Sequence, residues 1–308
     1  MNLQQYLKNL EVPNGKIDVV LDTDTYNEVD DQFAVAYLLA NQDKFSIKAF
    51  YAAPFFNENS TSPADGMEKS YNELCTLLDL AGYTNFKQVT FRGADCYLPD
   101  EKTPVISDAA KHLSALASAY TPEKPLYVVA IGAITNVASA LLLEPEIAEN
   151  IVVVWLGGHV HSHINTKEFN MRQDIAAARV VMGSGAPFVQ LPCVGCVSEF
   201  AISYIEMDTL LRGKNKLCDY LTNTVGKAIG MPKAAETPYA RVIWDVTAVA
   251  WLLNEDNCFM ESDVRALRLP NYENQYEPAD ESKQMRYVYR INRNALAADL
   301  FQKLGELK

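Results

Sequence analysis

The sequence lacks the features that would place the chain in a membrane or on nucleic acid. No stretch approaches the roughly 18 consecutive apolar residues of a membrane-spanning helix. The opening MNLQQYLKNLEVPNGK has no basic region, apolar run or small-residue cleavage site typical of a signal peptide. Lys and Arg number 27 against 39 Asp and Glu, a formal net charge of −12. This acidic balance argues against a nucleic-acid duplex or an anionic membrane surface as main partner, and we expect a cytoplasmic protein.

Cysteine is also sparse, with six residues in a chain of 308. This number does not indicate a disulfide scaffold. Cys193 and Cys196 form a CxxC pair, but the other four cysteines are scattered singly. A zinc site needs a second pair of ligands at suitable spacing, so we interpret the CxxC pair as structural.

The composition itself is that of a globular protein. Hydrophobic residues make up 49% of the chain and charged residues 21%, which is more apolar content than disordered chains have. The length fits one large α/β domain or two small ones. No low-complexity linker or internal repeat divides the sequence, and we expect a single domain over residues 1–308.

Short apolar runs alternate with helical patterns, which is typical of βαβ units. The alternation predicts an open, mostly parallel, Rossmann-like α/β sheet with helices on both faces. The expected strands are 17–21, 46–52, 89–92, 126–131, 151–156 and 188–191. The expected helices between them are 31–39, 62–80, 107–119, 136–143 and 175–182. Later segments predict a helix at 245–253, a late edge strand at 285–291 and a closing amphipathic helix at 294–304.

Ligands of such sheets bind beyond the carboxyl ends of the strands. The polar residues that follow the strands are therefore the candidate site residues. The densest group comes after the first strand, where Asp22 and Asp24 are followed by Asp30 and Asp31. The candidates after the other strands are Asn57, Thr135, Asn136, Asn165, Glu168, Asn170, Asp174 and Asp245.

The acids among these candidates predict a cation site. Unpaired carboxylates on one rim of the sheet would repel one another in a partly dry site. A hard divalent cation, Ca²⁺ or Mg²⁺, relieves that repulsion. Helix capping is the alternative, since Asp30, Asp31 and Asp245 stand at expected helix N-termini. Capping accounts for one acid per helix but not for four aspartates in the ten residues 22–31, so a metal is favoured there.

Two families open with an apolar strand followed by D-x-D. The haloacid-dehalogenase-type phosphatases use D-x-D-x-T or D-x-D-x-V, but the fifth residue here is Tyr26 and no late acidic pair follows a strand. The sequence resembles the inosine/uridine-type nucleoside hydrolases more closely. Their opening D-x-D-P-G-x-D-D stands here as DTDTYNEVDDQFAVAYLLA. The further matches, in the family's order, are AIGAITNVASALLLEP, IVVVWLGG with EFN, RQDIAAARVVMGSGAPFVQLP and VIWDVTAVAWLLN.

This resemblance, which spans residues 16–260, implies an open α/β fold and a Ca²⁺-dependent enzyme. It implies hydrolysis of the N-glycosidic bond of ribonucleosides to ribose and free base, in purine and pyrimidine salvage, by a homodimer or homotetramer. The implied metal ligands are Asp24, Asp31, the Thr135 carbonyl and Asp245. Asp24 is also the implied general base for a metal-bound water, and Asp22 would orient the ligands. The implied substrate contacts are Asp30, Asn57, Leu156, Glu168 and Asn170.

The sequence departs from the family pattern at three places. The loop between Asp24 and Asp30 holds five residues instead of three and lacks Pro-Gly, which brings residues 26–28 toward the expected site. The short segment 159–167 carries three alternating histidines, which bind a transition metal, protonate the leaving base or form a solvated loop: His159, His161 and His163. Trp244 stands where the inosine/uridine type has a His acid. Tryptophan does not protonate a purine effectively but can stack on it, which makes Trp244 a candidate catalytic residue.

Two other functions stay open at the level of the sequence. A dehalogenase-type, metal-dependent phosphatase would release inorganic phosphate and form no ribose. A non-catalytic nucleoside- or ribose-binding relative, suggested by Trp244, would bind ribose tightly without turnover. The sequence leaves open the preferred base and the group that protonates it.

Overall fold

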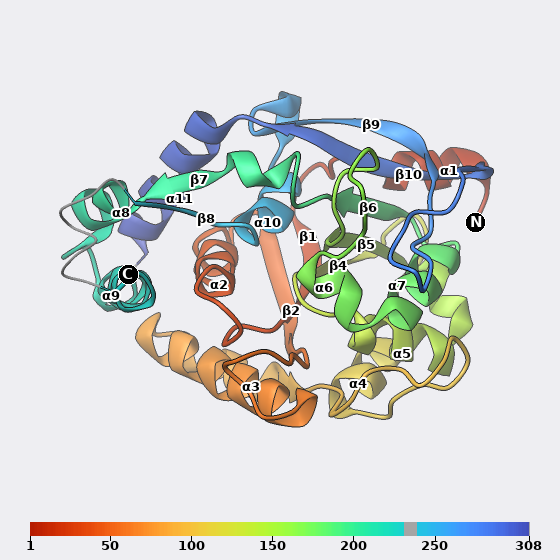
Figure 1. The fold of residues 1–308 in the computed structure, drawn as a ribbon, viewed down its shortest axis with the longest axis horizontal. Helices are drawn as coiled ribbons and strands as arrows, with labels where there is room; N and C mark the ends of the chain where they lie inside the picture. Colours follow the sequence, from red (N-terminus) through yellow and green to blue (C-terminus); the bar gives the residue numbers. More distant parts are fainter. Residues whose placement is uncertain (231–238, 308) are drawn as a thin grey trace.

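An eight-stranded sheet forms the centre of the molecule (Figure 1). The computed structural model describes residues 1–230 and 239–307. The strands of this sheet are β1 (Ile17–Thr23), β2 (Phe45–Ala52), β3 (Thr90–Arg92), β4 (Leu126–Ala130), β5 (Ile151–Leu156), β6 (Phe188–Leu191), β9 (Met260–Leu267) and β10 (Asp280–Ile291). Their order is β3-β2-β1-β4-β5-β6-β10-β9, and every pairing is parallel except that of β10 with β9. The expected open, mostly parallel α/β sheet is thus confirmed.

Helices cover both faces of the sheet, and a separate hydrophobic core lies under each layer. One core packs against α4 (Asp108–Ala117), α5 (Thr135–Leu143) and α7 (Ile175–Gly183). The other core packs against α2 (Asp31–Ala40), α3 (Pro63–Leu80), α8 (Tyr204–Leu211), α9 (Lys216–Ala228), α10 (Val246–Trp251) and α11 (Arg293–Glu306). Figure 1 shows α4, α5 and α7 on the right and α2, α8, α9 and α11 on the left. Because β4 and β5 are buried on both sides, their sequences are continuous apolar runs rather than alternating ones.

Three further elements are short. They are α1 (Leu3–Asn9), α6 (Phe169–Gln173), and the two-stranded sheet of β7 (Ala201–Ser203) and β8 (Ala240–Val242). Among the described residues, no helix combines the length and the apolar character needed to cross a membrane.

The expected elements up to residue 191 agree with the observed ones to within two residues at each end. The expected late edge strand at 285–291 is wrong in its position. The observed β10 lies inside the sheet between β6 and β9, and its inward side chains Met285, Tyr287 and Val288 are buried. The edge belongs to β9, whose sequence MESDVRAL is half-polar. Most side chains of β9 are half-buried at the edge of the sheet, so its residues do not form the apolar pattern that indicates a strand.

The winding of the sheet reverses beside β1. From β1 the chain proceeds to β2 and β3 on one side and then crosses to β4 on the other side. The residue pairs Asp22–Tyr51 and Asp22–Ala130 mark the carboxyl ends of these neighbouring strands. A crevice opens at such a reversal, and ligands of open α/β sheets bind there. The fold therefore places the acids that follow β1 where a ligand would bind.

Candidate active site

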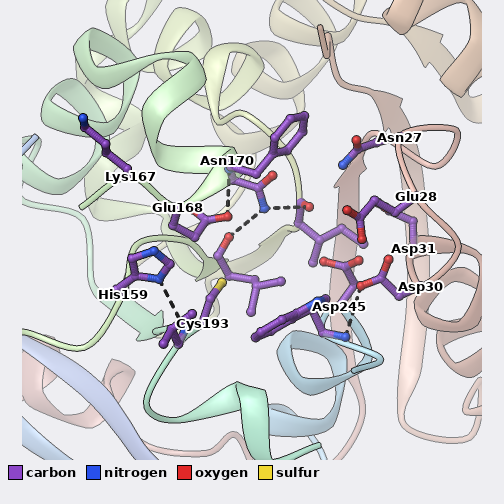
Figure 2. Close-up of a pocket in the computed structure, with 15 residues that line it drawn as sticks. Asn27, Glu28, Asp30, Asp31, His159, Lys167, Glu168, Asn170, Cys193 and Asp245 are labelled. Atoms are coloured by element: carbon purple, nitrogen blue, oxygen red, sulfur yellow. Dashed lines mark hydrogen bonds between the residues drawn. The ribbon is translucent and has the colours of Figure 1, made fainter. Parts of the chain in front are cut away.

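A cavity of about 220 Å³ lies at this end of the sheet. Loops that follow β1, β5, β6 and β8 contribute its walls, as Figure 2 shows. Seven of the residues predicted from the sequence line it: Asp30, Asp31, Leu156, Glu168, Asn170, Trp244 and Asp245. The other wall residues are Asn27, Glu28, Ile131, His159, Lys167, Phe169, Cys193 and Val194.

Three buried acids meet at one end of the cavity. Carboxylate oxygens of Asp30, Asp31 and Asp245 lie within 4.8 Å of one another. Asp30 and Asp245 occupy the N-cap positions of α2 and α10, but neither side chain makes a capping hydrogen bond. Asp31 accepts a hydrogen bond from the Thr23 hydroxyl at 2.6 Å. Capping therefore does not account for these carboxylates, which face one another instead.

Two more acids extend the cluster behind the cavity wall. Asp24 is fully buried, and neither of its carboxylate oxygens has a hydrogen-bond partner among the described residues. Gly132 leaves room for it, because a Cβ at that position would lie 3.0 Å from Asp24 Oδ1. Asp22 accepts a hydrogen bond from Asn136 Nδ2 at 2.8 Å, while its other oxygen has no described partner. Asn136 thus lies inside the first turn of α5 and holds Asp22.

Burial and mutual repulsion raise the pKa values of this acid cluster, which we define as Asp22, Asp24, Asp30, Asp31 and Asp245. Burial raises the pKa of Asp22 to about 7 and that of Asp30 to about 6. Burial, followed by the charge of the neighbouring acids, raises the pKa of the other three well above the ordinary range. Each shift records the cost of holding charge in a buried site among other acids; at Asp30 the charge of Arg241 opposes the rise.

The donor set fits a divalent cation. Oxygen ligands at close spacing, with unpartnered carboxylate oxygens on Asp24, are what a hard cation requires. In residues 1–230 and 239–307, Asp30, Asp31 and Asp245 form the one group of His, Cys, Asp or Glu side chains close enough to share a metal ion. Cys193 and Cys196 are both free and buried, and burial raises the pKa of the Cys193 thiol well above its usual range. No described residues complete a zinc site around them.

Glu168 and Asn170 form the wall that faces the acids. Glu168 caps α6 and accepts three backbone N–H bonds, from Gly158, Asn170 and Met171, at 2.8 to 2.9 Å. Burial raises its pKa, and these three donors oppose that rise. The Asn170 amide donates to the carbonyls of Ile131 and Leu156, each at 3.0 Å. The ends of β4 and β5 are thereby joined at the cavity.

Asn57 and Thr135, like Asp22 and Asp24, are not part of the cavity wall. Asn57 Nδ2 donates to Asn27 Oδ1 at 2.6 Å, and Asn27 lines the cavity in its place. Thr135 begins α5 and is fully buried, and its hydroxyl donates to Asp174 Oδ2 at 2.7 Å.

The three histidines of the segment 159–167 separate in the structure. His159 lines the cavity, and its Nδ1 accepts a hydrogen bond from the Val194 N–H at 3.3 Å. His161 packs against the rings of Tyr276 and Tyr287. His163 lies beside His159, with its Nδ1 2.9 Å from the Asn165 carbonyl. Within the described chain they form no shared metal site.

Trp244 and the loop after β1 are joined at the acid cluster. The Trp244 N–H donates to Asp30 Oδ2 at 3.1 Å. Glu28 pairs with Arg241 at 2.6 Å. The unusual length of the loop between Asp24 and Asp30 was the sequence signal for Asn27 and Glu28. In the turn after β6, Val194 carried no such signal because it is apolar, and Cys193 was interpreted as part of a structural CxxC pair.

Comparison with known proteins identifies the family. The inosine-uridine preferring nucleoside hydrolase family matches residues 19–296. A probable uridine nucleosidase 2 of Arabidopsis thaliana is 29% identical over 163 residues, which is 51% of this chain and 48% of that protein. The match thus spans about half the length of this curated relative.

Two solved structures share the fold. A plant nucleoside hydrolase superposes with a TM-score of 0.74 at 18% identity, covering 96% of this chain and 100% of that one. A purine-preferring ribonucleoside hydrolase from Gardnerella vaginalis gives 0.72 at 18% identity, covering 94% and 98%. These identities support the fold alone, whereas the family match extends over the cavity residues. The chain therefore belongs to the inosine-uridine preferring nucleoside hydrolase family.

Proposed function

We propose that this protein hydrolyses the N-glycosidic bond of ribonucleosides, giving ribose and a free base, and that it depends on Ca²⁺. The observation that carries the proposal is the acid cluster at the ligand-binding end of the sheet, where buried carboxylates lie close together and both oxygens of Asp24 have no described hydrogen-bond partner. The family match supports the reaction and argues against the phosphatase. The cytoplasmic location, the salvage role, the single domain and the homodimer or homotetramer stay predictions.

The proposed ligands of the cation are Asp24, Asp31, the Thr135 carbonyl and Asp245. When bound, a divalent cation would neutralise the cluster and lower the pKa of a coordinated water. Oxygen ligands and a carboxylate-rich site favour Ca²⁺ over softer metals.

Asp24 is the proposed general base. Its two unpartnered oxygens are free to accept the proton of a water that attacks the anomeric carbon. The new bond joins the water oxygen to that carbon as the bond to the base nitrogen breaks, and the bonding pair leaves with the base, which then takes up a proton. Asp22, held by Asn136, would orient the ligands of the cation.

The proposed substrate contacts lie on both sides of the cavity, with Asp30 in the acid cluster and the others opposite it. Asp30, Glu168 and Asn170 would bind sugar hydroxyls, Leu156 would contact the sugar ring, and Asn57 would act through Asn27. Such contacts accelerate the reaction when they strengthen as the ribosyl ring flattens toward an oxocarbenium ion. Trp244, beside Asp245, would stack on the leaving base.

A reducing-sugar assay over a panel of purine and pyrimidine nucleosides tests the proposal. We expect ribose release that is lost after treatment with a chelator and restored by Ca²⁺ more fully than by Mg²⁺ or Zn²⁺. Asp24→Asn should abolish release in the presence of saturating Ca²⁺. Phosphate release from phosphomonoesters without ribose would select the phosphatase, and tight ribose binding without turnover would select the non-catalytic relative.

A further inference from the structure

We propose that Glu28 recognises the leaving base and makes the enzyme prefer guanosine over inosine and adenosine. The Glu28 carboxylate accepts hydrogen bonds from the adjacent N1–H and 2-amino groups of guanine, of which hypoxanthine has only the first. The inference rests on the proposed function and deepens it, because it names the base that the site prefers. It concerns a charged residue of the cavity wall that the proposed reaction does not use.

Glu28 faces the cavity with an unused carboxylate oxygen. Lys167 also lines the cavity, but Figure 2 shows its side chain directed away from the acid cluster, whereas the Glu28 carboxylate points toward the interior. Glu28 Oε2 accepts a hydrogen bond from Arg241 Nη2 at 2.6 Å, and Oε1 has no hydrogen-bond partner in the described part of the chain. Because each carboxylate oxygen can accept two hydrogen bonds, both oxygens have room for a donor on a ligand.

The loop after β1 holds Glu28 between two anchored residues. Asn27 and Val29 are only 7% and 6% exposed. The Asn27 N–H donates to the Asp24 carbonyl at 2.7 Å, and the Asn27 carbonyl accepts a hydrogen bond from Asn59 Nδ2 at 2.8 Å. These contacts fix the backbone on both sides of Glu28, so its side chain reaches the cavity from a defined place.

A carboxylate at this position carries an electrostatic cost. The charge of Glu28 contributes to the raised pKa values of Asp30 and Asp31. Arg241 offsets part of that cost, since its charge lowers the pKa of Asp30. An ion pair whose acid is 45% exposed adds little to stability. A bound group that donates hydrogen bonds therefore accounts for an acid at this place better than stability does.

Glu28 and Trp244, on which the base is proposed to stack, belong to segments that are joined at two points. The Trp244 N–H donates to Asp30, two residues after Glu28. Arg241, which pairs with Glu28, stands three residues before Trp244. Both side chains line the cavity at the end that holds the acid cluster. A base that stacks on the indole would thus present its edge to Glu28.

The edge of guanine matches a carboxylate. Guanine presents N1–H and a 2-amino N–H side by side, and the two oxygens of one carboxylate can accept both. Hypoxanthine keeps N1–H but lacks the amino group, so one carboxylate oxygen loses its donor. Adenine has an acceptor nitrogen at position 1, which a carboxylate repels. The expected order of substrates is therefore guanosine, then inosine, then adenosine.

The test measures kcat/KM for these three nucleosides in the wild type, Glu28→Gln, Glu28→Ala and the control Glu68→Gln. Glu68 is a matched control, because it is 43% exposed and pairs with Arg92 at 2.7 Å but is not part of the cavity wall. For the wild type we expect a guanosine-to-inosine ratio of about 5- to 13-fold, which corresponds to one hydrogen bond to a charged, half-exposed acceptor. The difference should lie in KM, since the bond forms when the substrate binds.

In Glu28→Gln the ratio should fall to within about twofold of one. A glutamine amide offers a donor beside an acceptor, which matches the O6 and N1–H that guanine and hypoxanthine share, so the 2-amino group gains nothing. Glu28→Ala removes both acceptors and should bring the ratio to the same value. Glu68→Gln should keep the wild-type ratio.

Several results would overturn the inference. A wild-type ratio below about fivefold, faster hydrolysis of adenosine than of guanosine, or hydrolysis of pyrimidine nucleosides alone would show that the edge of guanine is not recognised. A wild-type ratio retained in Glu28→Gln or Glu28→Ala would assign the recognition to other residues. Loss of all activity in both variants would give Glu28 a different role, and an equal fall in Glu68→Gln would show a general effect of charge. Each of these leaves ribose release by the wild type intact, whereas its absence from every nucleoside would overturn the proposed function and the inference with it.

Discussion

Replacing Asp24 by Asn should remove the protein's response to Ca²⁺ without removing its fold. The change takes one negative charge from a fully buried position where neither carboxylate oxygen has a described partner. No protein hydrogen bond is lost, and the repulsion from Asp31 falls. In the presence of a chelator, we therefore expect the free energy of unfolding of the variant to be within about 1 kcal/mol of the wild-type value, or higher.

The expected size of the Ca²⁺ effect follows from linkage. At a free ion concentration one hundred times Kd, a ligand that binds only the folded state adds about 2.7 kcal/mol to the free energy of unfolding. An unfolding entropy of about 2.1 cal/mol/K per residue gives about 0.65 kcal/mol/K for 308 residues. The wild-type Tm should therefore rise by about 4 °C. The rise in Asp24→Asn should be below about 1 °C, because the cation loses a ligand and a charge.

Calorimetric unfolding in EDTA and in Ca²⁺ measures both quantities. Asp43→Asn is the matched control, because that carboxylate is 74% exposed and lies far from the cavity. The control should keep the full Tm rise. If Asp24→Asn keeps the wild-type rise as well, Asp24 is not a ligand and the assignment of the cation site is refuted.

Three further predictions concern Trp244, His161 and Glu168. Trp244→Phe should retain most of kcat/KM, while Trp244→Ala should lose about 5- to 150-fold if stacking contributes the usual 1–3 kcal/mol; equal damage in both would instead assign the role to the indole N–H. Burial lowers the pKa of His161 to about 4. Between pH 6.5 and 4 the unfolded chain therefore binds a proton at His161 that the folded chain does not bind. The contribution of neutral His161 to stability is complete above pH 6.5 and should be lost as the pH falls toward 4. His161→Phe should flatten that part of a denaturant-unfolding profile measured against pH, and an unchanged slope would contradict the assignment. Glu168→Gln should lower the free energy of unfolding by about 1–3 kcal/mol, since its amide nitrogen cannot accept the backbone N–H bonds; a variant as stable as wild type in thermal unfolding would show that the cap contributes little.

The fold was predictable where each element carries its own signal. β4 and β5 are buried on both faces, so their apolar runs appear directly in the sequence. The edge strand β9 carries no such signal, since its sequence alternates poorly and its partner β10 follows later in the chain. Strand order at the end of a sheet depends on pairing between distant segments, which local patterns do not record.

Part of the candidate site was also predictable, because some of its residues carry a local signal in the sequence. Charged residues after strands are conspicuous, and Asp30, Asp31 and Asp245 do meet in the structure. The indirect place of Asn57, behind Asn27, depends on one hydrogen bond across the loop and has no signature in the sequence. The separate environments of His159 and His161 depend on Tyr276 and on the turn after β6, which alternate spacing in the sequence does not reveal.

The hydrogen bond between Trp244 and Asp30 has a consequence for the stage of folding at which the chain can bind the proposed cation. The N–H of Trp244 donates to Asp30 across 214 positions of sequence, and the next residue, Asp245, lies beside Asp30 and Asp31. During synthesis, the β1 strand and its following helix emerge long before α10 does. A nascent chain that ends before Trp244 holds only part of the proposed ligand set, so we expect tight ion uptake to wait until the last third of the protein has folded onto the first. Ion affinity thus reports the completion of folding, and truncated products should remain ion-free even when their early sheet is intact.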